Sequence, residues 1–440
     1  MKKIIIVLVA LCFAFSIAGA LFASGGAEKG GAPEEKGAWG AKLQKRIEGR
    51  KDAPAAQPLT PTDFPADLLP GIDKPGALPK KQYFVTYSNG DMNDLWRLNH
   101  VKDMEAWGNA YMDRFGMKFM WTNAGNNSPK QVSDIESLVA LKPDLLIVSA
   151  NESEPLSAIY EFCQEVEVPF ITVDRGIATP LAWTYDDDSY ILHISMDFMW
   201  QGVVQGAAIV DYLNEKYGKP MGNVVELAGI PGSEPGIHRS IGLNLVLDQY
   251  PDIRIVATRP TEFDRKIAYE TMSDWLQKFG PGEIDAVAGS FDEGNLGALQ
   301  AIHEAGRDEL VGDAQFGIDA VLEFLEDIIK KETRITVETP PYFGMLAFEY
   351  GIRYLNGEKI PSLVMLPNRV YSAATPEKKT LLEKHISLMK ENRKDFPLVE
   401  WGGQAVFSYD VSKYYPKNWI EDPSLVDLPK YNTDPPIKTR

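Results

Sequence analysis

The sequence has few cysteines and few histidines, and this scarcity excludes two classes of protein. Its 440 residues include two cysteines and five histidines. Cys12 lies in the leading apolar run, so a processed chain keeps only Cys163 and can form no internal disulfide. The histidines show no metal-ligand spacing, and without a cysteine cluster the sequence predicts no metal site. The folded chain must therefore be held together by its apolar cores.

Positive charge is also scarce. Lysine and arginine together number 45 against 62 acidic residues, which gives a formal net charge of −17. Nucleic acids and anionic membranes attract basic surfaces, so we expect neither as a partner. The apolar fraction of 44 % and the length leave room for sizeable cores in two or three domains.

Several signatures of enzymes are missing. Residues 229–236 (GIPGSEPG) follow a predicted strand, but they lack both the Gly-Lys-Ser/Thr ending of a P-loop and the GxGxxG spacing of dinucleotide sites. We interpret them as a tight turn that starts a helix. The GxSxG and HExxH motifs are absent, and residues 186–188 (DDD) are interpreted as a solvated turn. The sequence thus predicts no catalytic residue and no cofactor.

The amino terminus has the layout of a secretory signal. Two lysines precede an apolar run from residue 4 to residue 22, and small residues follow. We predict cleavage after Ala23, with Ala20 as the alternative, and hence an exported, periplasmic protein. An uncleaved membrane anchor is the other reading, because the run approaches the roughly 20 residues that span a bilayer.

Residues 24–81 are rich in glycine, alanine and proline, which is typical of a tether or a surface arm. From residue 82 onward, short apolar runs alternate with amphipathic segments. We predict strands at 82–88, 117–122, 143–149, 168–173, 191–196, 223–228, 253–258, 284–289, 313–318 and 333–338. We predict helices at 94–115, 129–141, 154–166, 198–217, 236–250, 265–279, 292–306 and 319–331.

This alternation favours an α/β fold in which helices cover both faces of parallel sheets. Ten strands are many for one sheet, so we expect two similar lobes. Beyond residue 372 the pattern breaks. Thr375 and Pro376 are typical of a helix start, and this helix should reach about Lys394. The aromatic, aperiodic tail that follows is expected to pack across the lobes.

Polar and aromatic residues recur where the predicted strands end. The fourth strand ends on Asp174 and Arg175, and the carboxyl ends of parallel strands share the edge where ligands bind. An aspartate accepts hydrogen bonds and an arginine donates several in a fixed plane, so the pair can hold adjacent hydroxyls. A structural ion pair is the alternative. The other candidates at strand ends are Trp96, Arg97, Ser149, Phe263, Phe291, Asp292, Asp319 and Glu338.

Carboxylates, guanidinium groups and aromatic faces together suit a sugar, because charged groups bind its hydroxyls and aromatic rings cover its C–H faces. Several motifs, in order along the chain, add to this reading. They are VPFITVDR (168–175), GIPGS with HRSIG (229–242), FDR (263–265), FDEGNLGAL (291–299), FGID (316–319) and YLNGEKIP (354–361).

On these motifs the sequence closely resembles the periplasmic ribose-binding family of type I solute-binding proteins, the receptors of sugar ABC transporters. The resemblance implies two Rossmann-like lobes with parallel sheets, joined by a three-crossover hinge. The implied division is residues 82–195 plus 339–362 for the amino-terminal lobe, and residues 196–338 plus 363–372 for the carboxy-terminal lobe. Residues 373–440 form an extension. The implied partners are a small sugar, expected to be a monosaccharide, and a membrane permease, with the protein itself a monomer.

The resemblance also implies roles for single residues. Trp96 matches the aromatic clamp of the first lobe and Phe263 that of the second, while Arg97 resembles a variant found in relatives that bind hexoses. Asp174 and Arg175 match the pair that grips hydroxyls, and Asp319 the aspartate of the second lobe. Glu338 occupies a glutamine position and should make the pocket more acidic.

Three departures from the ribose pattern put ribose itself in doubt. A binding arginine of the family falls on Ile237, whereas Arg239, two residues later, matches an arginine to which we assign a structural role. Phe291 replaces an asparagine, and an insertion at residues 90–95 reshapes the wall beside Trp96.

Other functions remain open at this stage. The same lobes could present a ligand to a chemoreceptor or a histidine kinase, or could bind a nucleoside. A sugar or nucleoside hydrolase would need paired carboxylates committed to acid–base work, which the sequence does not show. The apparent leader argues against a repressor built on the same lobes.

Overall fold

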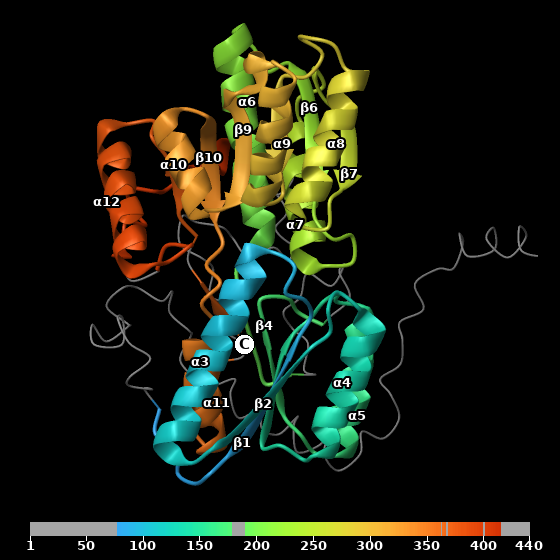
Figure 1. The fold of residues 1–440 in the computed structure, drawn as a ribbon, viewed down its shortest axis with the longest axis vertical. Coiled ribbons are helices and arrows are strands. Elements are labelled where there is room, and N and C mark those ends of the chain that lie inside the picture. Colours follow the sequence, from blue (N-terminus) through green and yellow to red (C-terminus); the bar gives the residue numbers. More distant parts are fainter. Residues whose placement is uncertain (1–76, 178–189, 362, 367, 399–400, 415–440) are drawn as a thin grey trace, which may run out of the picture. The chain divides into compact units, whose positions relative to one another are not determined.

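The computed structural model describes residues 77–177, 190–361, 363–366, 368–398 and 401–414 (Figure 1). The expected leader, most of the expected arm and the acidic run at 186–188 lie outside the described residues. Within the described ranges, no helix combines the length and the apolar character that crossing a bilayer requires.

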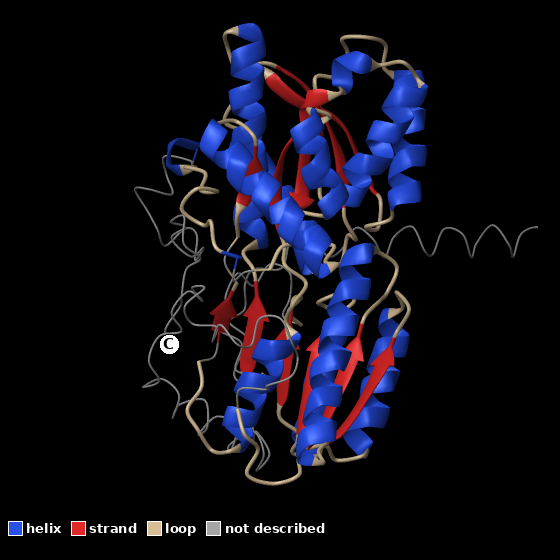
Figure 2. Ribbon diagram, turned by 60° about the vertical axis from the view of Figure 1, so that its left-hand side comes forward, coloured by secondary structure: helices blue, strands red, loops and turns tan. Residues whose placement is uncertain are grey.

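The first of two sheets has six parallel strands in the order β11-β5-β4-β3-β1-β2 (Figure 2). Its strands are β1 (Phe84–Asn89), β2 (Lys118–Asn123), β3 (Leu145–Ser149), β4 (Phe170–Val173), β5 (Leu192–Ser195) and β11 (Leu363–Met365). Its helices are α3 (Leu95–Phe115), α4 (Ser128–Ala140), the 3₁₀ turn η1 (Pro155–Ala158), α5 (Ile159–Glu165) and α11 (Gly344–Leu355). Figure 1 shows α3 and α11 on one side of this sheet and α4 and α5 on the other.

The second sheet also has six strands, in the order β12-β10-β9-β8-β6-β7, and only β12 runs antiparallel to its neighbour. Its strands are β6 (Gly222–Ala228), β7 (Ile253–Pro260), β8 (Ala286–Gly289), β9 (Gly312–Asp319), β10 (Thr333–Glu338) and β12 (Val370–Ser372). Its helices are α6 (Phe198–Tyr217), α7 (Glu234–Leu247), α8 (Arg265–Lys278), α9 (Asp292–Glu304), η2 (Asp308–Leu310) and α10 (Leu322–Lys330), followed later by α12 (Pro376–Asn392) and η4 (Ser412–Tyr414).

The chain passes between the two sheets three times. The passages lie between β5 and α6, between β10 and α11, and between β11 and β12. The expected fold, two α/β lobes joined by three crossovers, is therefore confirmed. One expected boundary needs correction: β11 pairs with β5 in the first sheet, whereas the sequence placed residues 363–372 with the carboxy-terminal lobe.

Local chemistry explains where the helices begin. Each expected strand and helix is present, with ends that move by a few residues. Asp94, Asp197, Ser233 and Asp264 each accept a hydrogen bond from the backbone N–H three residues later, which caps the helix that follows. Thr375 does the same for α12, as its place before a proline predicts. In the glycine-rich stretch 229–236, residues 229–233 form the turn into α7 and residues 234–236 are its first residues, as the sequence predicts.

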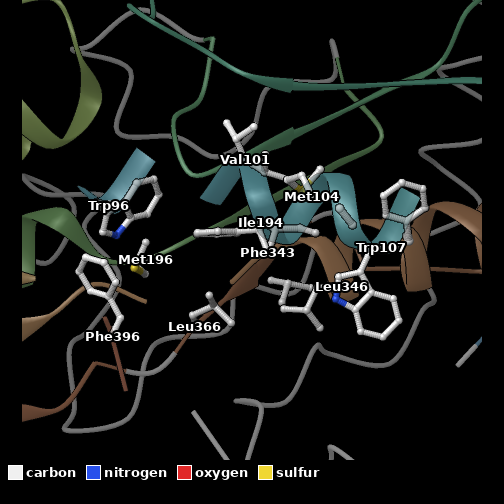
Figure 3. Close-up of a cluster of buried hydrophobic side chains, with 14 of the residues drawn as sticks. Trp96, Val101, Met104, Trp107, Ile194, Met196, Phe343, Leu346, Leu366 and Phe396 are labelled. Carbon is white, nitrogen blue, oxygen red and sulfur yellow. The ribbon is translucent and has the colours of Figure 1, made fainter. Parts of the chain in front are cut away.

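The largest apolar core joins the first lobe to parts of the extension. It contains Val101 and Trp107 of α3, Ile194 of β5, and Phe343 before α11 (Figure 3). The same cluster includes Phe396, which comes from the extension beyond α12. The extension is therefore part of the folded core and does not merely follow it.

Candidate functional site

A cleft lies where the carboxyl ends of strands from both sheets face each other. Seven of the residues predicted from the sequence line it, namely Trp96, Arg97, Asp174, Arg175, Phe263, Phe291 and Asp319. They come from the start of α3, the end of β4, the loop before α8, and the ends of β8 and β9. This convergence is the arrangement expected of ligand sites in open α/β sheets.

Asp174 and Arg97 form the centre of the first-lobe wall. An N–H of Arg97 donates to Asp174 Oδ2 at 2.6 Å and another donates to Ser149 Oγ at 2.9 Å. Asp91 Oδ2 lies 3.5 Å from Arg97 Nε. Burial lowers the pKa of Arg97, but the carboxylates of Asp174 and Asp91 outweigh it and hold that pKa above its usual range. Ser149, itself a predicted site residue, does not line the cleft and instead holds Arg97 in place.

Arg175 is held differently. One of its terminal N–H groups donates to the carbonyl of Asn151 at 2.8 Å, while its Nε is buried and has no hydrogen-bond partner within the described residues. Its guanidinium lies 5.5 Å from the centre of the Phe263 ring, which comes from the other lobe. Burial, and then the charge of Arg97, lower the pKa of Arg175 to about 10. An unmet buried donor at the cleft is a group that a ligand oxygen can satisfy.

Three of the predicted site residues have unusual backbone geometry. Asp174 has φ 62°, Phe263 has φ 58° and Asp319 has φ 136°, all in regions that residues with a side chain rarely adopt. Such conformations cost free energy and cluster at functional sites, because the surrounding structure must hold them there. Their coincidence at one cleft supports a functional role for it.

The second-lobe wall is organised by Arg239 of α7. Its guanidinium donates to Gln201 Oε1 at 2.8 Å, to the carbonyl of Ser290 at 2.6 Å and to Thr339 Oγ1 at 2.8 Å. It also donates to Asp319 Oδ1 at 3.2 Å. These bonds fit the structural role assigned to Arg239 from the sequence, yet the residue also lines the cleft.

Aromatic rings form the apolar part of the walls. The Trp96 indole donates to the carbonyl of Thr339 at 2.7 Å and stacks on His100 with ring centres 5.2 Å apart. Phe263 and Phe291 meet edge to face at 5.4 Å. Fixed rings of this kind present flat faces to a ligand at little entropic cost.

Besides Ser149, two more predicted site residues lie outside the cleft. Asp292 accepts from the backbone N–H of Val321 at 3.0 Å and from Thr336 Oγ1 at 2.7 Å, and burial raises its pKa well above the ordinary value. Glu338 accepts from Arg369 Nε at 2.6 Å, and both side chains are about 1 % exposed. Glu338 therefore binds an arginine of the third crossover and does not face the cleft. It does not supply the acidic group that the sequence leads us to expect in the pocket.

The acidity of the cleft comes from other carboxyl groups. Burial raises the pKa of Asp319 to about 7 against the opposing effect of Arg239. Burial, and then the charge of Asp91, raise the pKa of Asp94 to about 8. Burial also raises the pKa of Glu293. Burial thus disfavours the charged forms of these groups, whereas a ligand hydroxyl that donates to them would favour those charged forms.

Sequence reasoning missed eight lining residues. They are Asp94, Phe198, Pro235, Arg239, Glu293, Val321, Thr339 and Phe396. Asp94 lies in the insertion before Trp96 and carries a helix-cap signal that could have drawn attention to it. Glu293 directly follows the predicted Asp292. No sequence signal points to Phe396, because it lies in the aperiodic tail beyond α12.

The arrangement suits binding. Among the described residues, no group of three or more His, Cys, Asp or Glu side chains is placed to hold a metal ion. What the cleft offers is paired acceptors and donors between aromatic faces, contributed by two lobes. Fold and site together define a two-lobed protein that binds a small polar molecule between its lobes.

The comparisons with known proteins identify the family. A model described as the periplasmic binding protein domain matches residues 85–359, and the chain belongs to this family. The ribose import binding protein of Bacillus subtilis is 30 % identical over 289 residues, which are 66 % of this chain and 87 % of that protein.

Two solved structures have the same fold. The binding protein of an arabinose ABC transporter from Shewanella sp. ANA-3, bound to L-arabinofuranose, is 25 % identical, with a TM-score of 0.60. The match covers 70 % of this chain and 98 % of that one. The fructose-binding periplasmic domain of a hybrid two-component system is 26 % identical, with a TM-score of 0.59, and the match covers 71 % of this chain and 98 % of that one.

Proposed function

We propose that this protein captures a monosaccharide in its cleft and delivers it to the permease of an ABC transporter. The observation that carries the proposal is the cluster of Arg97, Asp174 and Arg175, which shares one cleft with Trp96 and Phe263. Relatives named for ribose and for L-arabinofuranose support a sugar as the ligand.

The cleft walls can form hydrogen bonds to ligand hydroxyls while they keep their internal ones. Asp174 now accepts from Arg97, and Asp319 from Arg239, so each carboxylate is held in place to accept from a ligand as well. The N–H at Arg175 Nε has no hydrogen-bond partner within the described residues, so it can donate to a ligand hydroxyl. Hydrogen bonds to charged groups contribute about 1.5–3 kcal/mol each, and micromolar affinity needs about −8 kcal/mol.

Closure of the lobes is part of the proposed mechanism. Hydrogen bonds among the described residues already cross between them: Leu95 N–H donates to Glu293 Oε2 at 3.1 Å, and Gly176 N–H donates to Glu234 Oε2 at 2.6 Å. The backbone N–H of Ser153 also donates to the carbonyl of Gly232 at 3.1 Å. A ligand that touches both walls adds contacts which exist only in the closed state, and so shifts the protein toward it.

The proposal also covers the oligomeric state, the localisation and the absence of catalysis. It acts as an exported, periplasmic monomer without catalysis. Light scattering should give the monomer mass, and cell fractionation should recover the processed chain outside the cytoplasm. A sugar incubated with the protein should be recovered unchanged by NMR, whereas turnover would favour a hydrolase.

Asp174→Asn tests the site. Asparagine tolerates the left-handed backbone at this position and keeps the side-chain shape. The change removes the charge and replaces one acceptor oxygen with an NH2 donor. We expect a panel of pentoses, hexoses, furanoses and polyols to include a ligand for the wild type in calorimetry. The variant should bind that ligand at least about a hundredfold more weakly, the equivalent of about 3 kcal/mol.

The matched control is Asp134→Asn, which alters a partly exposed carboxylate paired with Lys130 on α4, away from the cleft. It should bind as the wild type does. Unchanged affinity in Asp174→Asn would remove this cluster from the site, and a wild type that binds no sugar would overturn the proposed function.

A sensory role is a second candidate, because the fructose-binding domain of a two-component system has the same fold at comparable identity. The two roles predict different losses. Deleting the gene should abolish uptake of the labelled sugar if the protein feeds a permease. It should abolish the sugar-dependent phosphorylation or taxis response if the protein feeds a receptor.

A further inference from the structure

The carboxy-terminal extension returns to the cleft after leaving the family fold. The family match ends at residue 359, and α12 then packs beside α10 (Figure 1). Helix α12 ends at Asn392, and the cap residue Arg393, with a φ of 52°, turns the chain back. The next residues run to the crossovers between the lobes.

Residues 395 and 396 are bonded to both lobes. The carbonyl of Asp395 accepts from the backbone N–H of Leu322 at the start of α10, at 2.9 Å, and its carboxylate accepts from Asn99 of α3 at 2.9 Å. The carbonyl of Phe396 accepts from the Tyr342 hydroxyl, in the second crossover, at 3.3 Å. This short segment therefore bridges the lobes at their hinge.

The segment is also fixed on its downstream side. Arg369, in the third crossover, donates to the carbonyl of Leu398 at 3.0 Å and to the carbonyl of Gly402 at 2.7 Å. Arg369 is itself held by Glu338. Phe396 is thus anchored on either side of its position in the chain.

The Phe396 ring occupies the hinge end of the cleft. It is 1 % exposed and belongs to the same apolar cluster as Trp96 and Met196, next to which it lies in Figure 3. It lines the cleft together with Thr339 of the second crossover. A large apolar ring at that end offers no hydrogen bond and blocks further extension of a ligand toward the hinge.

We propose that Phe396 is a specificity-determining, ligand-contacting residue that the extension adds to the family's cleft. It restricts the site to single-ring sugars and polyols and requires a C–H face, not a hydroxyl, at the hinge end. This inference rests on the proposed function. It explains why a segment outside the family match is buried at the cleft.

The experiment compares two phenylalanines of the extension in the full chain. Phe396→Ala and Phe396→Leu alter the proposed wall. Phe407→Ala and Phe407→Leu are the matched controls, because Phe407 is also fully buried but packs on Tyr371, with ring centres 4.3 Å apart, and does not line the cleft. Calorimetry measures binding of the monosaccharide that the wild type prefers and of disaccharides that contain it.

We expect Phe396→Ala to weaken monosaccharide binding at least tenfold and to admit a disaccharide that the wild type rejects. Phe396→Leu should weaken binding at least threefold, through loss of the aromatic face. The Phe407 variants should remain within threefold of the wild type at a similar loss of thermal stability. If Phe396→Ala does not fold, Phe396→Leu decides the question.

The outcomes separate the two proposals. If the wild type binds sugar and both Phe396 variants bind it equally well, this inference fails and the proposed function stands. Equal losses in the Phe396 and Phe407 variants would also overturn it, since they would show a general effect of stability. If the wild type binds no sugar, the proposed function and this inference fall together.

Discussion

Arg97 and Arg175 are neighbours in the cleft, yet their surroundings act on them in opposite directions. Arg97 lies against Asp174 and Asp91, and its pKa is raised despite burial. Arg175 lies farther from the same carboxylates, at 3.6 and 3.7 Å, and burial lowers its pKa to about 10. The protein itself therefore supplies close acceptors to Arg97, whereas Arg175 keeps a buried N–H that a ligand oxygen can accept from.

Glu338 shows how far single residues could be predicted. The sequence correctly indicates a conspicuous carboxylate at the end of β10, but its partner Arg369 lies 31 residues away along the chain, in a crossover with no periodic pattern. A buried ion pair loses about 3–5 kcal/mol when one partner is removed, because the other charge stays buried and alone. Glu338→Gln should thus lower the free energy of unfolding by about 3 kcal/mol in urea denaturation.

The ligand affinity of folded Glu338→Gln should stay within about threefold of the wild type, a difference below 1 kcal/mol. Adding Arg369→Met should restore part of the stability. The control is Glu323→Gln, which breaks an exposed pair with Arg265 and should cost less than about 1 kcal/mol. If Glu338→Gln has normal stability but binds no ligand, Glu338 takes part in ligand binding and not in a structural ion pair.

At the scale of elements, α6 and α7 form a closely packed pair that positions Arg239. An added Cβ at Gly202 of α6 would lie 2.0 Å from the carbonyl oxygen of Arg239, and one at Gly242 of α7 would lie 2.2 Å from that of Met199. The helix backbones thus touch where these glycines face each other. The position of Arg239, and through it that of Asp319, depends on this contact.

Gly202→Ala tests this dependence. The methyl group must push α7 away, so we expect a loss of about 1–3 kcal/mol in unfolding free energy. The ligand affinity should also fall about tenfold or more, because Arg239 moves with its helix. Gly280→Ala is the control, since its nearest neighbour is the flexible Glu283 side chain at 3.4 Å. If Gly202→Ala is destabilised but binds the ligand with normal affinity, the contact between the helices does not control the position of the site residues.

Most elements could be predicted because their apolar residues repeat with clear periods. The exceptions are α11, β11 and β12, which lie in the region of the crossovers. The two strands have three residues each, too few for a period to show. The sheet that each joins depends on long-range contacts, which explains why residues 363–365 were assigned to the other lobe.

At the scale of the whole molecule, a buried carboxyl group links the two lobes at the cleft edge. Glu234 of α7 accepts from Gly176 N–H of the first lobe at 2.6 Å. Burial raises its pKa from an ordinary 4.5 to about 8, although the Gly176 N–H lowers it. The nearby charges are those of Asp174 and Arg175, and His238 Nδ1 lies 3.6 Å away.

This coupling predicts a pH dependence. Between about pH 4.5 and pH 8 the folded protein keeps a proton on Glu234 that the unfolded chain releases, so stability decreases as the pH rises through this window. Glu234→Gln has no such proton. The unfolding free energy of the wild type should therefore fall relative to that of Glu234→Gln by up to about 1.4 kcal/mol per pH unit.

Denaturation at several pH values from 5 to 8 measures this difference, with the exposed Glu383→Gln as the control that keeps the wild-type slope. Parallel curves for wild type and Glu234→Gln would show that Glu234 is not protonated in the folded state.

The three passages of the chain between the sheets also set the order in which the molecule can be completed. The first sheet has most of its strands once residue 195 has been made, but its edge strand β11 follows the whole of β6 to β10. The second sheet receives β12 only a few residues later. Until then the edges of β5 and β10 remain open to pairing with other chains. In a partly synthesised chain each sheet therefore lacks an edge strand. Both sheets are completed almost together, near the end of synthesis.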